Sequence, residues 1–328
     1  MEEGQPKIDV HHHVAPPGYV STLAARGILE VGGRPFTPWD EEETLSLLDR
    51  HGIETALLSL SAPGVFFGDL GLARELARSC NEFLAGLVKD HPRRFGAFAV
   101  LPLPDVEASF AELAYALDIL ELDGVGLLSS VDGRYMGDPA YGELFEELDR
   151  RRVPVFMHPH TPDDKVTPVL PLPSSLIEFV FETTRATASL LFTGTLERCP
   201  NLRIILPHAG GTVPYIALRL CLGQFWPGLQ EHVPLGVLTY LQRLYYDTAL
   251  SAAPFALRSL QELVDVTHVL FGSDYPFAPE LATVATIEGL KEYDGFDDME
   301  LESIFHLNAR ELFPRLGGGK MKCGADDA

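Results

Sequence analysis

The chain has 328 residues, of which 46% are hydrophobic and 22% charged, a composition typical of a globular protein. Its 25 basic and 47 acidic residues give a formal net charge of -22, which argues against nucleic acid or an anionic membrane as the partner. A surface this acidic also repels small anions. A carboxylate substrate would therefore need a local cation, either a metal ion or an arginine.

The cysteines and the N-terminal sequence indicate a cytoplasmic protein. Four cysteines are scattered along the chain without CxxC spacing, which is typical of reduced thiols. The first residues, MEEGQPKIDV, are acidic and lack the apolar segment of a signal peptide. No apolar run approaches the roughly 18 residues of a membrane-spanning helix. We expect a soluble protein without a membrane partner.

Short apolar segments alternate with segments of helical character along the chain. The predicted strands are Lys7–Val10, Thr55–Leu60, Phe95–Leu101, Gly124–Leu128, Val153–Met157, Arg203–Leu206, Leu244–Tyr246 and Val269–Phe271. The predicted helices include Glu41–Arg50, Leu72–Lys89, Val106–Leu120, Tyr141–Arg151 and Leu176–Arg198. Strands that are apolar throughout are typical of a parallel sheet covered on both faces.

Eight strand–helix units within residues 1–316 predict an α/β protein with a single (β/α)8 barrel. The alternative, a doubly wound sheet, would require a glycine-rich phosphate-binding sequence after the first strand, and none is present. We expect loops at 29–39 and 161–173 on the catalytic face. The last residues, 317–328, read GGGKMKCGADDA and are predicted to form a disordered tail.

Five side chains that can bind metal or transfer protons stand at the ends of predicted strands. His11 and His13 follow the first strand in DVHHHVAPP, and their alternate spacing places both on one face. His158 in VFMHP, His208 in ILPHAGG and Asp274 in FGSDYPF follow three later strands. Because the carboxyl ends of barrel strands meet at one face, we expect these groups to gather there, around a metal site.

Each of these residues also has a plainer interpretation. A histidine after an apolar strand is more often a hydrogen-bonded core residue than a ligand, and Asp274 could cap the helix that follows. Asp9 could orient a ligand or could simply make a hydrogen bond at the strand start. His12 points away from the pair, and Pro159 separates His160 from its strand, so both are interpreted as structural.

Three neutral imidazoles and one carboxylate suit a divalent cation of the zinc type, with an open position for water or substrate. Manganese is the alternative. A two-metal site would need a bridging anion, often a carbamylated lysine at the end of the fourth strand, where this chain reads VGLLSSVDGR. We therefore expect one metal ion and no organic cofactor.

The quoted segments, together with the closing IFHLNARELF, resemble the amidohydrolase superfamily. They are most similar to its decarboxylase branch, which is related to aminocarboxymuconate-semialdehyde decarboxylase. The similarity extends from Lys7 to Leu316. Within the branch, FETTRATASLLFTGTLERCPNLRIILPHAGGTVPY and LYYDTALSAAPFAL most resemble the 6-methylsalicylate decarboxylases, with γ-resorcylate decarboxylase more distant.

The resemblance implies a metal held by His11, His13, His158 and Asp274, with His208 as the catalytic acid/base. It implies a homodimer in which a basic residue of the neighbouring subunit reaches the site. The implied reaction is nonoxidative decarboxylation of a small aromatic acid, in which ring-carbon protonation precedes loss of carbon dioxide. Asp274 would act either as a ligand alone or also as a partner in proton delivery.

Such a substrate requires a flat, apolar pocket with a cation for its carboxylate. The side chains expected to form it are Arg34, Phe36, Trp39, Ser61, Phe66, Arg185, Tyr275 and Phe277. Other functions remain open. The same metal could activate water for hydrolysis of a lactone or amide, with Asp274 taking the proton, or the protein could be a hydratase. A barrel with a purely structural metal is disfavoured, because such a site would not need His208.

Overall fold

The structure is a computed structural model that describes residues 5–36, 39–162 and 170–317. Eight parallel strands form one sheet in the order β1-β4-β5-β6-β9-β10-β11-β12, which confirms the predicted barrel. Their bounds are β1 Lys7–Val14, β4 Ile53–Leu60, β5 Phe95–Val100, β6 Gly124–Leu128, β9 Pro154–His158, β10 Arg203–Leu206, β11 Tyr245–Asp247 and β12 Val269–Leu270. Backbone hydrogen bonds from Val10 N to Phe271 O (3.0 Å) and from His13 N to Tyr275 O (2.7 Å) bring the two ends of the sheet together.

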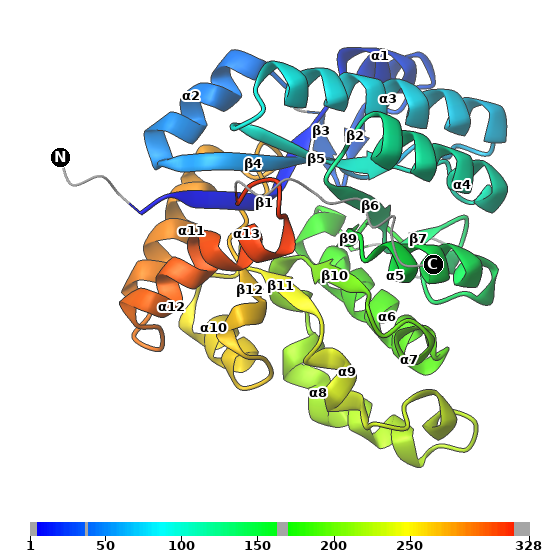
Figure 1. Ribbon diagram of the computed structural model, residues 1–328, viewed down its shortest axis with the longest axis vertical. Helices are drawn as coiled ribbons and strands as arrows, with labels where there is room; N and C mark the ends of the chain where they lie inside the picture. Colours follow the sequence, from blue (N-terminus) through cyan, green and yellow to red (C-terminus); the bar gives the residue numbers. More distant parts are fainter. Residues whose placement is uncertain (1–4, 37–38, 163–169, 318–328) are drawn as a thin grey trace, which may run out of the picture.

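Helices surround the strands (Figure 1). They are α1 Pro17–Ala25, α2 Glu41–His51, α3 Leu70–Asp90, α4 Val106–Ala114, α5 Gly142–Arg151, α6 Glu178–Phe192, α7 Thr195–Arg198, α8 Val213–Cys221, α9 Val237–Leu241, α10 Pro254–Gln261, α11 Glu280–Glu292, α12 Asp298–Glu302 and α13 Asn308–Leu312. Two antiparallel hairpins lie outside the barrel sheet: β2 Glu30–Val31 with β3 Arg34–Pro35, and β7 Ser130–Val131 with β8 Arg134–Tyr135.

Several predicted element boundaries differ from the structure, among them those of the first strand and of one long helix. The first strand does not end at Val10 but continues to Val14, because His12 and His13 pair with Leu58 and Ser59 of β4. The histidines are therefore part of a buried strand. The long predicted helix Leu176–Arg198 is divided into α6 and α7 at Gly194, whose φ of +76° lies in the left-handed region that glycine adopts without steric cost.

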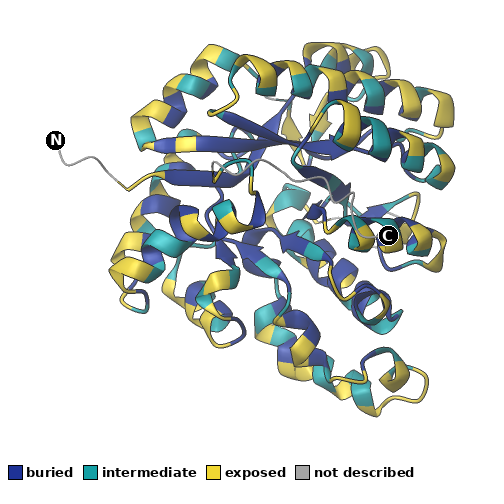
Figure 2. Cartoon of the chain, in the orientation of Figure 1, coloured by how far each residue is buried: buried dark blue, intermediate teal, exposed yellow. Residues whose placement is uncertain are grey.

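The barrel interior is packed with apolar side chains below the level of the histidines. Phe98 of β5 stacks on Phe156 of β9 with their ring centroids 5.3 Å apart. The same buried cluster includes Leu312 and Phe313, which close the barrel at the end opposite the histidines. Figure 2 shows the strands buried and the outer faces of the helices exposed. This packing leaves the carboxyl end of the barrel as the place where polar groups can form a site.

Parts of three predicted segments lie outside the described residues. These are Gly318 onward in the predicted tail, 37–38 in the first loop and 163–169 in the second. Within the described ranges, none of the helices combines the length and the apolar character needed to cross a bilayer.

Candidate metal centre

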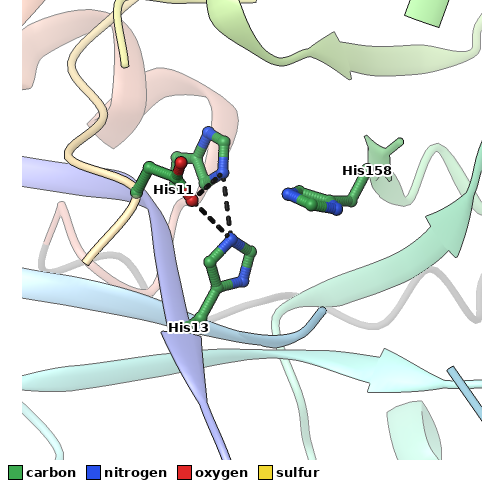
Figure 3. A group of neighbouring side chains, drawn as sticks. His11, His13 and His158 are labelled. Carbon is green, nitrogen blue, oxygen red and sulfur yellow. Dashed lines mark hydrogen bonds and ion pairs between the residues drawn. The ribbon is translucent and has the colours of Figure 1, made fainter. Parts of the chain in front are cut away.

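Four side chains converge at the carboxyl end of the barrel. His11 and His13 extend from β1, His158 is the last residue of β9, and Asp274 follows β12. One ligand atom from each lies within 4.8 Å of the others. His11 Nε2 is 3.1 Å from His13 Nε2, and Asp274 Oδ1 is 3.3 and 3.0 Å from these two nitrogens. Figure 3 shows the three labelled imidazoles around one centre.

The pKa shifts of His13, His158 and Asp274 suit a metal site. Burial lowers the pKa of His158, and the neighbouring imidazoles of His13 and His11 lower it further. Burial likewise lowers the pKa of His13. Burial alone would raise the pKa of Asp274, but the charge of His11 and hydrogen bonds from the histidines hold it well below its ordinary value. Neutral imidazoles and an ionised carboxylate are the forms that bind a divalent cation.

His11 differs from the other two histidines. Burial lowers its pKa, but the charges of Asp247 and Asp274 outweigh that effect and raise the pKa to about 10. Without a cation, His11 is therefore protonated at neutral pH and carries a positive charge between two carboxylates. A divalent cation would replace that proton at the centre.

Each ligand imidazole has a hydrogen-bond partner on the side away from the centre. The Nδ1 atoms contact Asp247 Oδ2 at 2.7 Å for His11, Ser59 Oγ at 2.9 Å for His13 and the Pro159 carbonyl oxygen at 2.7 Å for His158. These contacts fix the ring orientations and leave each Nε2 free to face the centre.

Two of these partners, Asp247 and Ser59, were not predicted from the sequence. Asp247 is the last residue of β11, so the criterion that found the other site residues, a polar group at a strand end, would also have found it. Ser59 lies inside β4, and its role depends on the register that places it beside His13. Nothing in its local sequence indicates that role.

Asp9 holds the segment that carries Asp274. Its Oδ1 accepts a hydrogen bond from Ser273 N at 3.0 Å, and its Oδ2 accepts one from Ser273 Oγ at 2.6 Å. Asp274 itself has a φ of +63° and donates its backbone N–H to His11 O at 2.8 Å. The possible capping role of Asp274 is wrong, because the residue preceding α11 is Pro279.

His12 and His160 lie outside the ligand cluster. His12 Nδ1 bonds to Asp9 Oδ2 at 2.9 Å, on the side of β1 away from the cluster. His160 Nε2 bonds to Ser130 Oγ at 2.8 Å. Both imidazoles are held by polar partners that are not members of the ligand cluster.

His208 lies beside the cluster without being part of it. Its Nε2 is 3.6 Å from Asp274 Oδ2, and its ring centroid is 5.0 Å from that of His11. Its Nδ1 is buried and has no hydrogen-bond partner among the described residues. Both His208 and Ala209 have positive φ, at 55° and 54°. Such left-handed backbone in residues with a Cβ is concentrated at functional sites.

A cavity of about 430 Å³ opens over the cluster. Its lining includes His158, His208 and Asp274, so the candidate ligands and His208 face the same space. Most of the rest is apolar: Leu176, Phe179, Val180, Leu250, Phe277, Ala278 and Ala282. Arg34 is the one arginine among the described residues of the lining, and it donates a hydrogen bond to Phe277 O at 3.1 Å. Of the predicted pocket residues, Arg34, Ser61 and Phe277 are therefore at the cavity.

The other aromatic candidates lie elsewhere, which corrects the prediction. Phe36 and Trp39 pack against the core between barrel and helices, where Trp39 meets Phe83 edge to face. Phe66 lines a different, smaller cavity. Tyr275 packs on His12, with centroids 5.3 Å apart, because it follows the strand end on the outward side. Apolar character alone did not distinguish cavity walls from core.

Arg185 is also misplaced by the prediction. Its Nη1 donates to Glu182 Oε1 at 2.8 Å, one helical turn away on α6. That carboxyl oxygen also accepts from Tyr135 OH at 2.8 Å. Arg185 is therefore part of an ion pair that joins α6 to the β7–β8 hairpin, and it is absent from the described lining of the cavity.

Comparison with known proteins agrees with this architecture. Residues 8–315 match the family described as Amidohydrolase, and the chain belongs to that family. It is 37% identical to the decarboxylase MacB of Penicillium terrestre, covering 94% of this chain and 95% of that protein. It is 35% identical to 6-methylsalicylic acid decarboxylase of Penicillium expansum, covering 95% and 97%. The decarboxylase branch predicted from the sequence is confirmed.

Solved structures give the same result. The 2,6-dihydroxybenzoate decarboxylase in complex with 2,6-dihydroxybenzoate superposes with a TM-score of 0.79 at 28% identity, covering 94% of this chain and 99% of that one. A dihydroxybenzoic acid decarboxylase from a Polaromonas strain, with bound manganese and the inhibitor 2-nitroresorcinol, has a TM-score of 0.79 at 26% identity, covering 94% and 97%.

Proposed function

We propose that the protein is a metal-dependent, nonoxidative decarboxylase of a small aromatic carboxylic acid of the hydroxybenzoate class, such as 6-methylsalicylate. The observation that carries the proposal is the joint arrangement of His11, His13, His158 and Asp274 with a further histidine, His208, at one apolar cavity. The names of the relatives support carbon–carbon cleavage as the reaction.

The four ligand residues fit one divalent cation. Three imidazole nitrogens and one carboxylate oxygen are a donor set used for zinc, which we propose as the metal. Manganese, bound in the Polaromonas neighbour, is the alternative. When bound, the cation would supply positive charge that neutralises the carboxylate and ortho oxygens of the substrate and fixes the ring.

Arg34 and the cavity walls position the substrate. We assign the substrate carboxylate to Arg34, because a guanidinium can form two parallel hydrogen bonds with it. Phe179 and Phe277 provide flat apolar surfaces for the ring, and Ser61 contributes a hydroxyl to the same lining. An apolar lining excludes water from the reacting carbon.

His208 delivers the proton. We assign its Nε2 as the acid, since that atom faces Asp274 at the edge of the ligand cluster. The proton forms a bond with the ring carbon that carries the carboxylate. The carbon–carboxylate bond then breaks, and its electron pair restores the aromatic ring as carbon dioxide leaves. Asp274 Oδ2, 3.6 Å from His208 Nε2, is placed to stabilise the protonated imidazole, and this contact favours a second role for the ligand.

A substrate panel tests this function. The metal-loaded protein is incubated with 6-methylsalicylate, 2,6-dihydroxybenzoate, a muconate-type acid and an aromatic lactone, while carbon dioxide release and ring products are followed. The proposal expects carbon dioxide from at least one hydroxybenzoate and no lactone hydrolysis. Lactone opening without decarboxylation would contradict the proposal and identify a hydrolase. Addition of water to the conjugated acid would instead identify a hydratase.

We also propose that the protein forms a homodimer through the face of α8. Tyr215 and Leu218 on α8 are 87% and 80% exposed, and Leu222 and Trp226, which follow α8 in the chain, are exposed as well. Apolar side chains exposed together in this way are typical of an interaction site. Light scattering of the purified protein should give twice the chain mass, and Leu218→Glu should shift it to the monomer. A monomeric wild-type protein at micromolar concentration would refute the dimer.

A further inference from the structure

We propose that Asp247 is a positioning residue that fixes a metal ligand and the proton donor with one carboxylate. The inference rests on the proposed function and adds a residue to it. Asp247 is the last residue of β11 and is fully buried. Its Oδ2 contacts His11 Nδ1 at 2.7 Å, and its Oδ1 accepts the backbone N–H of His208 at 2.9 Å and that of Ala249 at 3.0 Å.

The contact with His11 determines which ring nitrogen faces the cluster. A carboxylate accepts hydrogen bonds and does not donate them when ionised, so the proton of the neutral imidazole resides on Nδ1. The lone pair then lies on Nε2, which is 3.1 Å from His13 Nε2 and 3.3 Å from Asp274 Oδ1. Asp247 therefore presents His11 to the centre in its ligating form.

Close packing holds this contact in place. Gly272 follows β12, and a Cβ atom at this position would lie 2.8 Å from His11 Cβ and 3.2 Å from the carboxyl carbon of Asp247. The backbone after β12 thus approaches the Asp247–His11 pair so closely that only glycine fits at position 272 without displacing its neighbours. The carboxylate has little room to move away from the imidazole.

The contact with His208 acts through its backbone. His208 and the next residue, Ala209, both have left-handed φ values, a conformation that is costly for residues with a Cβ unless the surroundings hold it. The His208 ring itself is not fixed by a hydrogen bond at Nδ1, because that atom has no partner in the described part of the chain. The hydrogen bond from His208 N to Asp247 Oδ1 therefore fixes where the imidazole lies relative to Asp274.

The test compares Asp247→Ala with Asp123→Ala. Asp123 is a similarly buried carboxylate that is held by Arg315 before the first residue of β6, at the opposite end of the barrel. For each variant, Mn²⁺ affinity is measured by calorimetry, and kcat is measured at saturating Mn²⁺. Asp247→Ala should weaken Mn²⁺ binding about 10–100-fold, the usual effect of losing a ligand's hydrogen-bond partner. Its kcat should stay reduced when every chain holds an ion, while Asp123→Ala changes neither quantity.

Wild-type affinity or wild-type kcat at saturation in Asp247→Ala would overturn the proposal. A second measurement needs no variant. In the zinc-loaded wild-type protein, ¹⁵N NMR should show His11 protonated at Nδ1 and ligated through Nε2, and ligation through Nδ1 would overturn the proposal. Both metal readouts stand even if no hydroxybenzoate is decarboxylated, so failure of the proposed function is distinguishable from failure of this assignment.

Discussion

His13 Nε2 and Asp274 Oδ1 lie 3.0 Å apart although His13 is in the first strand of the barrel and Asp274 lies in the segment after the last strand. The contact exists because β1 and the segment after β12 are joined by backbone hydrogen bonds, among them His13 N to Tyr275 O and Asp274 N to His11 O. Closure of the barrel therefore completes the ligand set. Metal binding should stabilise the closed fold, because the unfolded chain has no such site.

Metal binding should release a proton from His11. The pKa of His11 is raised to about 10 by the two neighbouring carboxylates, so it is charged in the metal-free protein at pH 7 and must lose its proton to become a ligand. Affinity should thus increase with pH, about tenfold per unit while His11 remains protonated in the free protein. Calorimetry of Mn²⁺ binding in buffers of different ionisation enthalpy between pH 6.5 and 8 measures the proton count. A count of zero would contradict this protonation state.

Arg34→Gln should raise KM for the aromatic acid about tenfold or more. A hydrogen bond to a charged group contributes about 1.5–3 kcal/mol, and 1.4 kcal/mol corresponds to a factor of ten. Steady-state kinetics with metal-saturated protein measure the change. Arg185→Gln is the matched control, since that guanidinium is paired with Glu182 outside the described cavity lining, and it should leave KM unaltered. An unchanged KM in Arg34→Gln would mean that another cation binds the carboxylate.

His208→Asn should lower kcat about 10²–10⁴-fold, the usual contribution of a positioned acid. The substitution keeps a polar side chain and removes the proton donor. Because His208 is not one of the four clustered ligands, metal content measured by mass spectrometry should match the wild-type protein. Undiminished turnover would reject the role of His208 as the acid.

Phe156→Ala should destabilise the barrel beneath the site. Phe156 is fully buried, stacks on Phe98 and lies with its ring centroid 4.8 Å from that of His11. Its loss leaves a cavity and should cost about 3–5 kcal/mol in the free energy of unfolding, measured by urea denaturation. Phe181→Ala, at a side chain that is 41% exposed, should cost much less. Equal losses would show that Phe156 is not part of a tightly packed floor.

The sequence predicted the barrel and the side chains that converge at its mouth because both follow from local signals. Apolar segments at regular spacing define the strands. Because all strands of the barrel are parallel, the residues at their carboxyl ends gather at the same end of the barrel. His158, His208 and Asp274 were found in this way. The pocket wall was predicted less well. An aromatic residue has the same apolar character whether it faces the cavity or the core, as Phe36, Trp39, Phe66 and Tyr275 show.

The partners of the ligands depend on tertiary register. Ser59 contacts His13 only because β1 and β4 pair with these residues opposite one another. Asp9 contacts Ser273 only because the closed barrel brings β1 beside the segment after β12. No periodicity or spacing in the chain encodes such contacts.

Anomalous diffraction from crystals grown with Mn²⁺ tests the central claim most directly. The account predicts one manganese peak per chain, within coordination distance of His11 Nε2, His13 Nε2, a ring nitrogen of His158 and a carboxylate oxygen of Asp274. A peak elsewhere, two peaks at the barrel mouth, or no peak at saturating Mn²⁺ would contradict it.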